Sequence, residues 1–406
     1  MDFDDSPAEA SFRQKVRKWL EENGELKQTP RQKFAPELNE AERLASARRW
    51  QAKKALAGFA GITLPCKYGG RAGSHIQQVI YQQEESAFLV PFGFYEIGLG
   101  MCIPTILAYA SEEQKERYVP KALAGEEIWC QLFSEPAAGS DLAGVQTSAR
   151  RDGGSWVLNG QKVWTTGAHF SNYGIVLARS EPEKPKHKGL TMFFLPMNSP
   201  GIEIRPIAQM PGGSDFNEVF FTDVRVPDSN RLGEAGDGWQ VALTTLKHER
   251  LTVGSDIGLI DVDDVVSLLK RIDRNNDPFE ESLIQERLVD WHIQSQGIRL
   301  LNQRAITALS KGDEPGPELS ITKLIAAKAA QQMANFCMDL MGEQALLGAE
   351  HLGDKWESIE HSWYWSAAMR IAGGTDEVLR NIIAERVLQL PQENRPDKRE
   401  PYNSAT

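Results

Sequence analysis

Apolar positions recur at two different spacings along this chain, and the spacing changes twice. From Ser6 to about Gly125 they recur every three or four residues, which is the period of an α-helix that buries one face. From about Ile128 to Arg231 they come in short runs separated by turn residues, and after Gly238 the helical period returns. The pattern predicts a mainly α-helical protein with a central β domain.

The first region reads as a set of helices with breaks at Gly69-Gly70 and Pro91. Ser111 is followed three residues later by Gln114, the spacing of a capping box, in which each side chain bonds the backbone amide of the other residue. We therefore expect a helix to start directly after Ser111.

The central region contains several short β-like runs and one turn signal. Asn159-Gly160 lies between Trp156–Leu158 and Gln161–Trp164, and this dipeptide suits the positive φ angles of a two-residue hairpin turn. Further strands are expected at Gly174–Ala178, Leu190–Pro196, Ile202–Pro206 and Val219–Val226. Five or more short strands without a long helix between them predict an antiparallel β-barrel or sandwich.

The last region predicts an antiparallel helical bundle. Its expected helices are Trp239–Val253, Pro278–Leu309, Leu319–Leu347 and Asp376–Leu390. The tail from Pro391 has no periodicity, and we expect it to be loosely held. The predicted domains are residues 1–127 (N-terminal α-helical domain), 128–232 (β domain) and 233–406 (C-terminal helical bundle).

Composition excludes several classes of function. The net charge of -11 argues against a nucleic-acid partner, and Ile97–Leu107, the most apolar segment, is too short to span a membrane. The acidic N-terminus is unlike a signal peptide, and the four cysteines form no CxxC pair. No histidine spacing suggests a metal site, and neither a Rossmann fingerprint, a P-loop nor a GxSxG elbow occurs. We expect a cytoplasmic protein with reduced thiols.

Two segments of the central region are candidates for ligand contact. Leu132–Asp141 (LFSEPAAGSD) has small residues, a proline and two serines, so its backbone amides can approach a ligand closely, although a tight surface turn is equally plausible. Trp164-Thr165-Thr166 could pack an aromatic cofactor and hydrogen-bond its edge. Taken alone, a strand tryptophan is more often part of the core.

The expected helix from Trp239 to Val253 carries two charges on its apolar stripe. At about 100° per residue, Glu249 and Arg250 fall among Trp239, Ala242, Leu243, Leu246 and Val253. Charge on a buried face is costly unless it is paired or used, so the two residues form either a structural ion pair or part of a site.

A fourth candidate is Ala372–Glu377, where Gly373-Gly374 precede Thr375, a plausible helix cap. A helix N-terminus after glycines presents free amides to an anion or a carbonyl oxygen, although many ordinary helices begin in this way.

These pieces, taken in order, resemble the acyl-CoA dehydrogenase family over nearly the whole chain. The matching stretches are SEEQKERYVPKALAGEEI (Ser111–Ile128), LFSEPAAGSD (Leu132–Asp141), LNGQKVWTT (Leu158–Thr166), FNEVFFTDVRVP (Phe216–Pro227) and GGTDEVLRNIIAERVLQLP (Gly373–Pro391). The resemblance implies FAD as cofactor, an acyl-CoA thioester as substrate, a homotetramer or homodimer, and the fold of an N-terminal helical domain, an antiparallel β-barrel and a C-terminal helical bundle.

The resemblance also implies roles for residues that match the family's motifs. Leu132, Phe133 and Ser134 would line the flavin ring, Trp164 would cover it, and Thr166 would bond near N5. Ser140 would meet the pyrophosphate or the CoA moiety. The full set implied for the cofactor is Leu132, Phe133, Ser134, Gly139, Ser140, Trp164, Thr165, Thr166, Met341, Gly342, Thr375 and Glu377, and that for the substrate is Ser140, Leu246, Arg250, Gly373 and Gly374.

The chain departs from the commonest family pattern at its catalytic base. Many members carry a glutamate just before Gly-Thr, where this chain has Gly373. The isovaleryl- and long-chain-type members place the base in a Glu-Arg pair on a helix of the C-terminal domain, and Glu249-Arg250 match that placement. Glu249 is thus the predicted general base, and Arg250 would orient it or hold the CoA. Small residues at Ala372 and Gly373 leave room for branched, long or ring-bearing acyl groups.

Two further motifs differ from the family. The usual Arg-x-x-Phe-Gly is replaced by Leu269–Arg274, and Asp339–Glu343 stands near the usual Gln-x-x-Gly-Gly. The leading hypothesis is a dehydrogenase that passes electrons to an electron-transferring flavoprotein. The alternatives are an oxidase or flavin monooxygenase on the same scaffold, and a catalytically silent FAD-binding partner subunit.

Overall fold

The computed structural model describes residues 5–28, 38–253, 259–272, 278–313, 316–347, 354–395 and 399–404; for residues 248–253, 278–280, 354, 355, 357 and 404 the description covers the backbone only. The chain forms two compact units. One comprises Asp5–Thr252 and the C-terminal segment from Glu393, and the other comprises Val253–Gln392. The predicted boundaries after residues 127 and 232 remain predictions.

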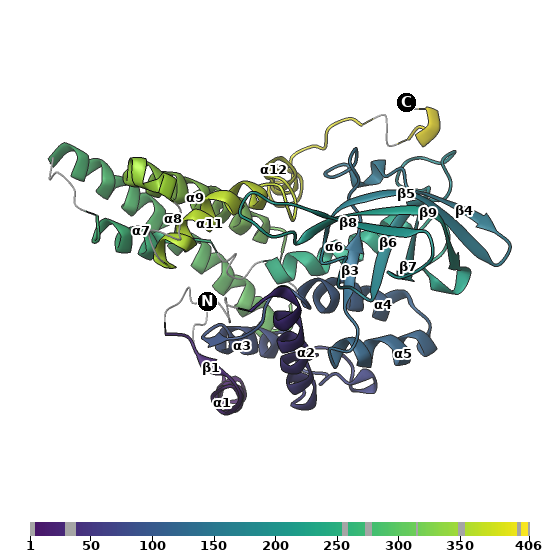
Figure 1. Cartoon of the computed structure of the whole chain (residues 1–406), viewed down its shortest axis with the longest axis horizontal. Helices are drawn as coiled ribbons and strands as arrows, with labels where there is room; N and C mark the ends of the chain where they lie inside the picture. Colours follow the sequence, from purple (N-terminus) through teal and green to yellow (C-terminus); the bar gives the residue numbers. More distant parts are fainter. Residues whose placement is uncertain are drawn as a thin grey trace. The chain divides into compact units, whose positions relative to one another are not determined.

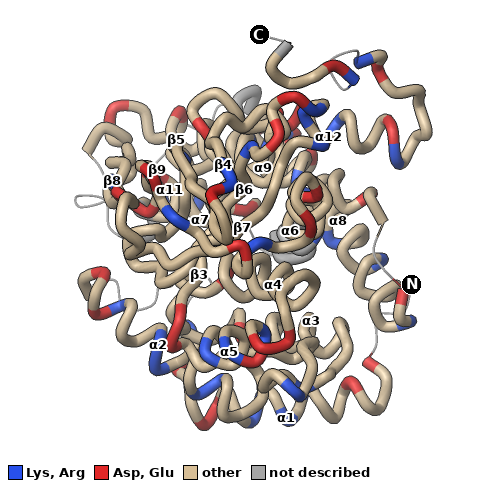
Figure 2. The backbone as a smooth tube through the Cα atoms, turned by 90° about the vertical axis from the view of Figure 1, so that its right-hand side faces the viewer, with Lys and Arg blue, Asp and Glu red and all other residues tan. Residues whose placement is uncertain are grey.

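The N-terminal region is helical, as predicted. Its helices are α1 (Pro7–Asn23), α2 (Glu40–Leu56), α3 (His75–Glu85), α4 (Ile103–Tyr109) and α5 (Glu112–Leu123). The capping box at Ser111 and Gln114 is confirmed at the start of α5, and α1, α2 and α3 begin in the same way. Both acidic and basic residues occur along α1 and along α5 (Figure 2).

The β region forms one twisted sheet that packs against these helices (Figure 1). Its strands are β3 (Trp129–Leu132), β4 (Ser148–Asp152), β5 (Ser155–Thr166), β6 (Tyr173–Arg179), β7 (Leu190–Pro196), β8 (Ile202–Ile207), β9 (Phe216–Pro227) and β10 (Arg231–Leu232). A separate pair joins β1 (Glu25–Leu26) to β2 (Phe88–Leu89).

The expectation of an antiparallel barrel is corrected by the strand order. The order is β10-β7-β6-β4-β5-β9-β8, so among the described strands β10 and β8 are the ends of an open path. Moreover, β3 pairs with β6 in parallel, and β4 forms a single parallel bridge with β6, between Ser148 and Arg179. The periodicity of a strand shows which face is buried but not which partner it takes, so a long crossover from β3 to β6 is invisible in it.

The hairpin predicted at Asn159-Gly160 is also wrong. Strand β5 runs through both residues, and the turn lies earlier, at Gly153-Gly154 between β4 and β5. The dipeptide instead forms a bulge, where the register against β9 shifts between Leu158 and Gly160. Gly160 does have a positive φ (147°), but glycine is needed there because the backbone passes close to Thr147. A Cβ at Gly160 would lie 2.7 Å from the Cα of Thr147.

Helix α6 (Gly238–Val253) follows the sheet and packs against α4. The hydroxyls of Thr105 and Thr245 are 2.8 Å apart and fully buried, and those of Tyr109 and Thr244 are 3.0 Å apart. The buried face of α6 contains Val241, Ala242 and Thr245. Leu243, which was expected on the apolar stripe, is 36% exposed.

The second unit is helical, as predicted for this part of the chain. It contains α7 (Val262–Leu269), α8 (Pro278–Ser310), α9 (Leu319–Met341), α11 (Asp354–Met369) and α12 (Asp376–Ile382). Two predicted helices end early: α9 stops at Gly342, whose φ of 52° breaks the helix before a 3-10 turn, and α12 gives way to the π turn Ile383–Val387. None of the described helices is long and apolar enough to cross a membrane.

The tail differs from expectation at its described end. The backbone amide of Tyr402 donates to the Lys184 carbonyl over 3.0 Å, and Pro401 forms an isolated β-bridge with Pro185. A segment without periodicity can still dock when one aromatic side chain finds a partner, and periodicity does not report such a contact.

Substituting Gly160 by alanine should destabilise the protein. The new Cβ would collide with Thr147 and the residue would keep a positive φ, so we expect a loss of about 1–3 kcal/mol in the free energy of unfolding. Gly154→Ala is the matched control, because nothing lies within 4 Å of a Cβ at Gly154. Urea denaturation followed by circular dichroism measures both variants, and equal midpoints would contradict the bulge account.

Candidate functional site

The loop Leu132–Asp141 begins where β3 ends, and its first two side chains anchor it. Leu132 is fully buried in a core formed by side chains of the β region. Phe133 is 5% exposed and lies in a second core, formed by side chains of the sheet and of the helices. Because these side chains point into two different cores, the chain beyond them has a fixed starting point. What the loop can present to a ligand starts at the half-buried Ser134.

A buried ion pair between Lys162 of β5 and Glu135 fixes the first part of this loop. The Lys162 ammonium, fully buried on β5, donates to the Phe133 carbonyl (3.0 Å) and to the Glu135 carboxylate (2.8 Å). Glu135 in turn accepts from the backbone amides of Gln146 (2.6 Å) and Thr147 (2.9 Å). The network thus ties the start of the loop, and residues 146 and 147 just before β4, to the Lys162 position of β5.

The two charges of this pair respond differently to burial. Burial lowers the pKa of Lys162 to about 8, although Glu135 opposes the shift. Burial also tends to raise the pKa of Glu135, but attraction by Lys162 and hydrogen bonds from Lys162 and Thr147 outweigh it, so the carboxyl pKa is lowered. Glu135 therefore stays ionised near neutral pH, and its partners stay ordered around it.

Trp164 lies on β5 in a conformation that L-residues seldom adopt. Its φ is 59°, its side chain is 58% exposed, and its ring meets Phe216 edge-on at 5.9 Å. The register against β9 shifts between Lys162 and Thr165, which is where the extra residue of a bulge turns the indole outward. A large aromatic ring held out in strained backbone fits a planar ligand better than a core role.

The neighbours of Trp164 are placed differently from one another. Thr165 is 1% exposed, and its hydroxyl finds no hydrogen-bond partner among the described residues, while its carbonyl accepts from the Asn217 amide (3.0 Å). Thr166 is half-buried at the end of the strand. Of the two hydroxyls, that of Thr166 is therefore the more accessible to a ligand.

The far end of the loop has open, accessible backbone. A Cβ at Gly139 would meet nothing within 4 Å, so no described contact requires glycine there, and the backbone lies open to a ligand. Ser140 is exposed beside it, and Asp141 is held by the Lys186 ammonium at 2.9 Å. Together with the exposed Trp164, this open backbone fits a flavin ring and its phosphates.

The predicted base and its neighbour lie partly outside the described residues. Leu246 is half-buried on α6 and packs against the helix–sheet core. Glu249 and Arg250 belong to α6, but their side chains are outside the described residues.

The second unit contains the remaining predicted residues. Gly373 and Gly374 have φ angles of 65° and 96°, and the Lys323 ammonium from α9 donates to the Gly374 carbonyl. The Thr375 hydroxyl caps α12 by accepting from the Val378 amide (3.2 Å), as predicted from the sequence.

Other side chains around this glycine turn have clear structural partners. Asp376 is 2% exposed and pairs with Arg370, which donates to it from Nε over 2.9 Å, whereas Glu377 is exposed and lies 3.7 Å from Arg380. Met341 packs partly into the core of this unit, and Gly342 ends α9. The turn at Gly373-Gly374 is thus fixed by Lys323 and Arg370.

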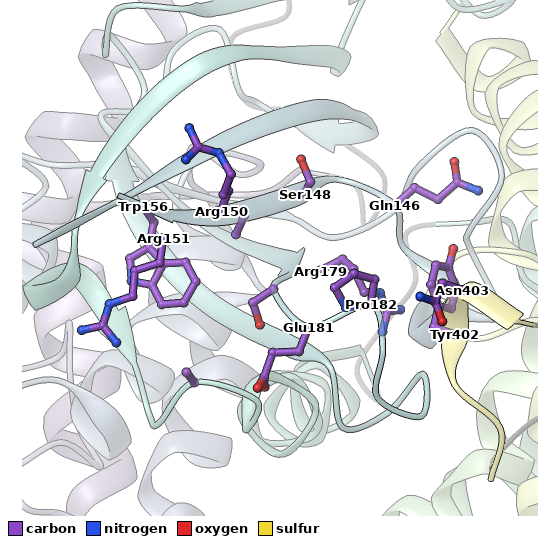
Figure 3. A pocket seen from close by; sticks show the side chains of 13 residues that line it. Gln146, Ser148, Arg150, Arg151, Trp156, Arg179, Glu181, Pro182, Tyr402 and Asn403 are labelled. Atoms are coloured by element: carbon purple, nitrogen blue, oxygen red, sulfur yellow. The ribbon is translucent and has the colours of Figure 1, made fainter. Parts of the chain in front are cut away.

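A pocket of about 800 Å³ opens on the sheet unit (Figure 3). Its wall includes Arg150, Arg151 and Arg179 together with Trp156 and Tyr402, and none of the predicted site residues lines it. The Arg150 and Arg151 side chains point in different directions in Figure 3. We therefore assign no ligand to this hollow.

Sequence reasoning missed the residues that hold the site rather than line it. Lys162 is separated from the buried Trp156 and Leu158 by an even number of positions, so alternation along the strand places it on the same, core-facing side. A charged residue at such a position was the signal that the sequence offered. Lys323, buried on α9, gave a similar signal within an apolar helix. Both act on backbone carbonyls, which a sequence motif does not display.

Three family models match successive parts of the chain. They are the acyl-CoA dehydrogenase N-terminal domain (residues 6–126), middle domain (130–224) and C-terminal domain (236–388). Acyl-CoA dehydrogenase IpdE1 of Mycobacterium tuberculosis is 36% identical over 388 residues, which cover 94% of this chain and 98% of the relative. FadE34 of the same organism is 39% identical over 328 residues, covering 81% of this chain and 44% of that protein.

Solved structures are similar over the whole chain. A structure titled Tcur3481-Tcur3483 steroid ACAD has a TM-score of 0.77 at 26% identity and covers 97% of this chain and 100% of that one. The ChsE4-ChsE5 complex from Mycobacterium tuberculosis has a TM-score of 0.75 at 26% identity, with the same shares covered. The chain belongs to the acyl-CoA dehydrogenase family and is an FAD-dependent oxidoreductase.

Proposed function

We propose that the protein desaturates an acyl-CoA thioester between its α and β carbons, with Glu249 as the base that removes the α-proton. An α C–H beside a thioester is a weak acid, so the site must place a base beside it and stabilise charge on the thioester oxygen. FAD, when bound, supplies the acceptor for the hydride from the β carbon.

The described half of α6 supports Glu249 as the base. Thr245 and Ala242 are fully buried, and position 249 follows them by four and seven residues, which is the spacing of one helix face. An apolar surrounding in general raises the pKa of a carboxyl group, and this is the property that a base acting near neutral pH needs. Gly373 offers no carboxylate, so it would contribute only its backbone amide to the thioester oxygen.

We assign the flavin end of FAD to the loop from Leu132 to Ser134 and to the strand end from Trp164 to Thr166. The observation that carries this assignment is the exposed indole of Trp164 in strained backbone next to the accessible Thr166. The backbone at Gly139 and the hydroxyl of Ser140 would meet phosphate groups of FAD or CoA. Met341, Gly342, Thr375 and Glu377 are assigned to the rest of the cofactor, on the family resemblance.

We propose bulky, ring-bearing acyl groups as the substrate class. The small residues Ala372 and Gly373 leave space beside the glycine turn, and the similar Tcur3481-Tcur3483 structure is titled a steroid enzyme. Leu246, half-buried on α6, would border the acyl group, Arg250 would hold the CoA part, and Gly374 would contact the thioester.

We propose an electron-transferring flavoprotein as the acceptor and a homotetramer or homodimer as the assembly. A second assembly, in which this chain pairs with a different chain, is favoured by its similarity to a chain of the ChsE4-ChsE5 complex. Measuring the mass of the assembly in solution, with the protein expressed alone and then together with a candidate partner chain, distinguishes these assemblies.

Replacing Glu249 by glutamine should leave FAD bound and slow its reduction by substrate. Loss of a positioned general base costs roughly 10²–10⁴-fold in rate. Anaerobic stopped-flow absorbance measures bleaching of the flavin, and Glu234→Gln, an exposed loop residue, is the matched control. Bleaching at a near-normal rate in Glu249→Gln would assign the base to another residue.

Replacing Lys162 by methionine should weaken both the fold and FAD binding. Glu135 would be left as an unpaired buried charge, which costs about 3–5 kcal/mol, and the Phe133 carbonyl would lose its donor. The thermal midpoint and the flavin content after gel filtration are the measurements. Arg205→Met, which breaks an exposed pair with Glu203 on the same sheet, should change neither. Wild-type flavin content in Lys162→Met would refute the proposed role of the pair.

A panel of CoA thioesters tests the proposed substrate class. We expect ring-bearing and branched thioesters to bleach the flavin with a higher kcat/KM than butyryl-CoA. A strict preference for short straight chains would contradict the space inferred at Ala372 and Gly373, whereas rapid reoxidation of the reduced flavin by air would favour an oxidase.

A further inference from the structure

The C-terminal residues Pro401–Asn403, here called the strap, are fastened to a turn of the β sheet unit. The amide of Tyr402 donates to the Lys184 carbonyl (3.0 Å) and that of Asn403 donates to the Pro182 carbonyl (3.1 Å). Tyr402 and Asn403 lie beside Pro182 and Arg179 in Figure 3. These backbone contacts give the strap a defined register on the turn between β6 and β7.

The side chain of Tyr402 contacts a different part of the sheet unit. Its hydroxyl donates to the Gly144 carbonyl (3.0 Å), and its ring lies 3.9 Å from the guanidinium carbon of Arg179. A cation that stacks on an aromatic face at this distance is stabilised by the ring's quadrupole. Tyr402 is thus bonded to one loop and stacked on a cation that serves the same loop.

Arg179 is a buried cation whose hydrogen bonds within the described residues all go to backbone carbonyls. It is 4% exposed and donates to the carbonyls of Ala143, Val145 and Lys186, and in the part of the chain that the structure describes no carboxylate forms an ion pair with it. Burial lowers the pKa of this guanidinium, so it depends on the carbonyls and on the Tyr402 ring for compensation. Removing the ring would open the Arg179 network to water.

The segment held in this way continues directly from the loop assigned to FAD and CoA. Lys186 binds the Asp141 carboxylate at one end of residues 141–147, and Glu135 accepts from Gln146 and Thr147 at the other. Arg179 and Tyr402 hold the middle. All of these groups except Tyr402 come from residues 135–186, so the strap is the one distant element in this network as described.

We propose that Tyr402 is a positioning residue for substrate binding. By holding Gly144 and covering Arg179, the strap keeps residues 141–145, and with them Ser140, in the shape that the CoA end of the thioester requires. The effect is expected on binding and not on the proton-transfer step, because the contacts described for the strap go to Gly144, Arg179 and residues 182–185, none of which is assigned to the chemistry. This inference rests on the proposed function for its kinetic part only.

The test compares Tyr402→Ala, Tyr402→Phe and a chain that ends after residue 398. In Tyr402→Ala we expect KM for the acyl-CoA to rise roughly 3- to 10-fold while kcat changes little, as for loss of one hydrogen bond and one cation–π contact. The truncated chain should match it. Tyr402→Phe keeps the ring and should fall between Tyr402→Ala and the wild type.

A second readout needs neither FAD nor substrate. Hydrogen exchange of the apoprotein should show faster exchange of the amides in residues 141–146 in Tyr402→Ala, and unchanged exchange in α5. Glu400→Ala, an exposed neighbour on the same segment, is the matched control and should leave exchange and KM at wild-type values.

The outcomes separate this inference from the proposed function. If the wild type is reduced by acyl-CoA but Tyr402→Ala and the truncated chain keep wild-type KM and wild-type exchange, the strap has no positioning role. A fall in kcat with unchanged KM would also overturn the proposal. If no thioester reduces the wild-type flavin, the proposed function fails, and the exchange experiment alone decides whether the strap orders residues 141–146.

Discussion

The buried ammonium of Lys162 is the constraint around which the β half of the site is arranged. A buried ammonium is costly unless it is paired, and here the Glu135 carboxylate and the Phe133 carbonyl accept two of its hydrogen bonds. Glu135 is then obliged to take the Gln146 and Thr147 amides to stabilise its own charge. One unfavourable burial therefore specifies the path of the chain from Phe133 to Thr147, which includes the segment assigned to FAD.

The same logic recurs in the second unit and in the strap. Lys323 bonds the Gly374 carbonyl, and Arg179 bonds three carbonyls beside the strap. In each case a basic side chain donates to the carbonyls of irregular backbone next to a proposed binding element, and these bonds form without any group of the ligand. Cations placed on carbonyls give a loop a single conformation before a ligand arrives, which lowers the entropy lost on binding. Such preorganisation suits a site that must hold a long cofactor and a long thioester.

Much of the fold could be predicted from periodicity, because helix and strand faces leave a regular trace in the sequence. The cap at Ser111 and the strand Leu190–Pro196 are in the structure as expected. The errors came from residues whose signal has two physical readings. Asn159-Gly160 has the positive φ of a turn but uses it for a bulge, and Gly342 ends a helix that the apolar pattern carried on to Leu347. Strand partners and the docking of Tyr402 depend on contacts distant in sequence, which periodicity does not encode.

For the site, the sequence indicated the candidate segments, because runs of small residues, motif residues such as Trp164-Thr165-Thr166 and charges on an apolar helix face can be recognised in the sequence itself. It did not reveal Lys162, Arg179 or Lys323, each of which donates to at least one backbone carbonyl that no sequence motif displays. The central claim is that this chain oxidises an acyl-CoA thioester through Glu249, and the most direct measurement is anaerobic titration of the FAD-loaded protein with α-protonated and α-deuterated thioesters. We predict that the thioester bleaches the oxidised flavin absorbance of the wild type stoichiometrically, and that the bleaching is slower with the α-deuterated thioester. In Glu249→Gln the bleaching should be nearly absent. Flavin that stays oxidised with every thioester tested, in protein that retains FAD, would contradict it.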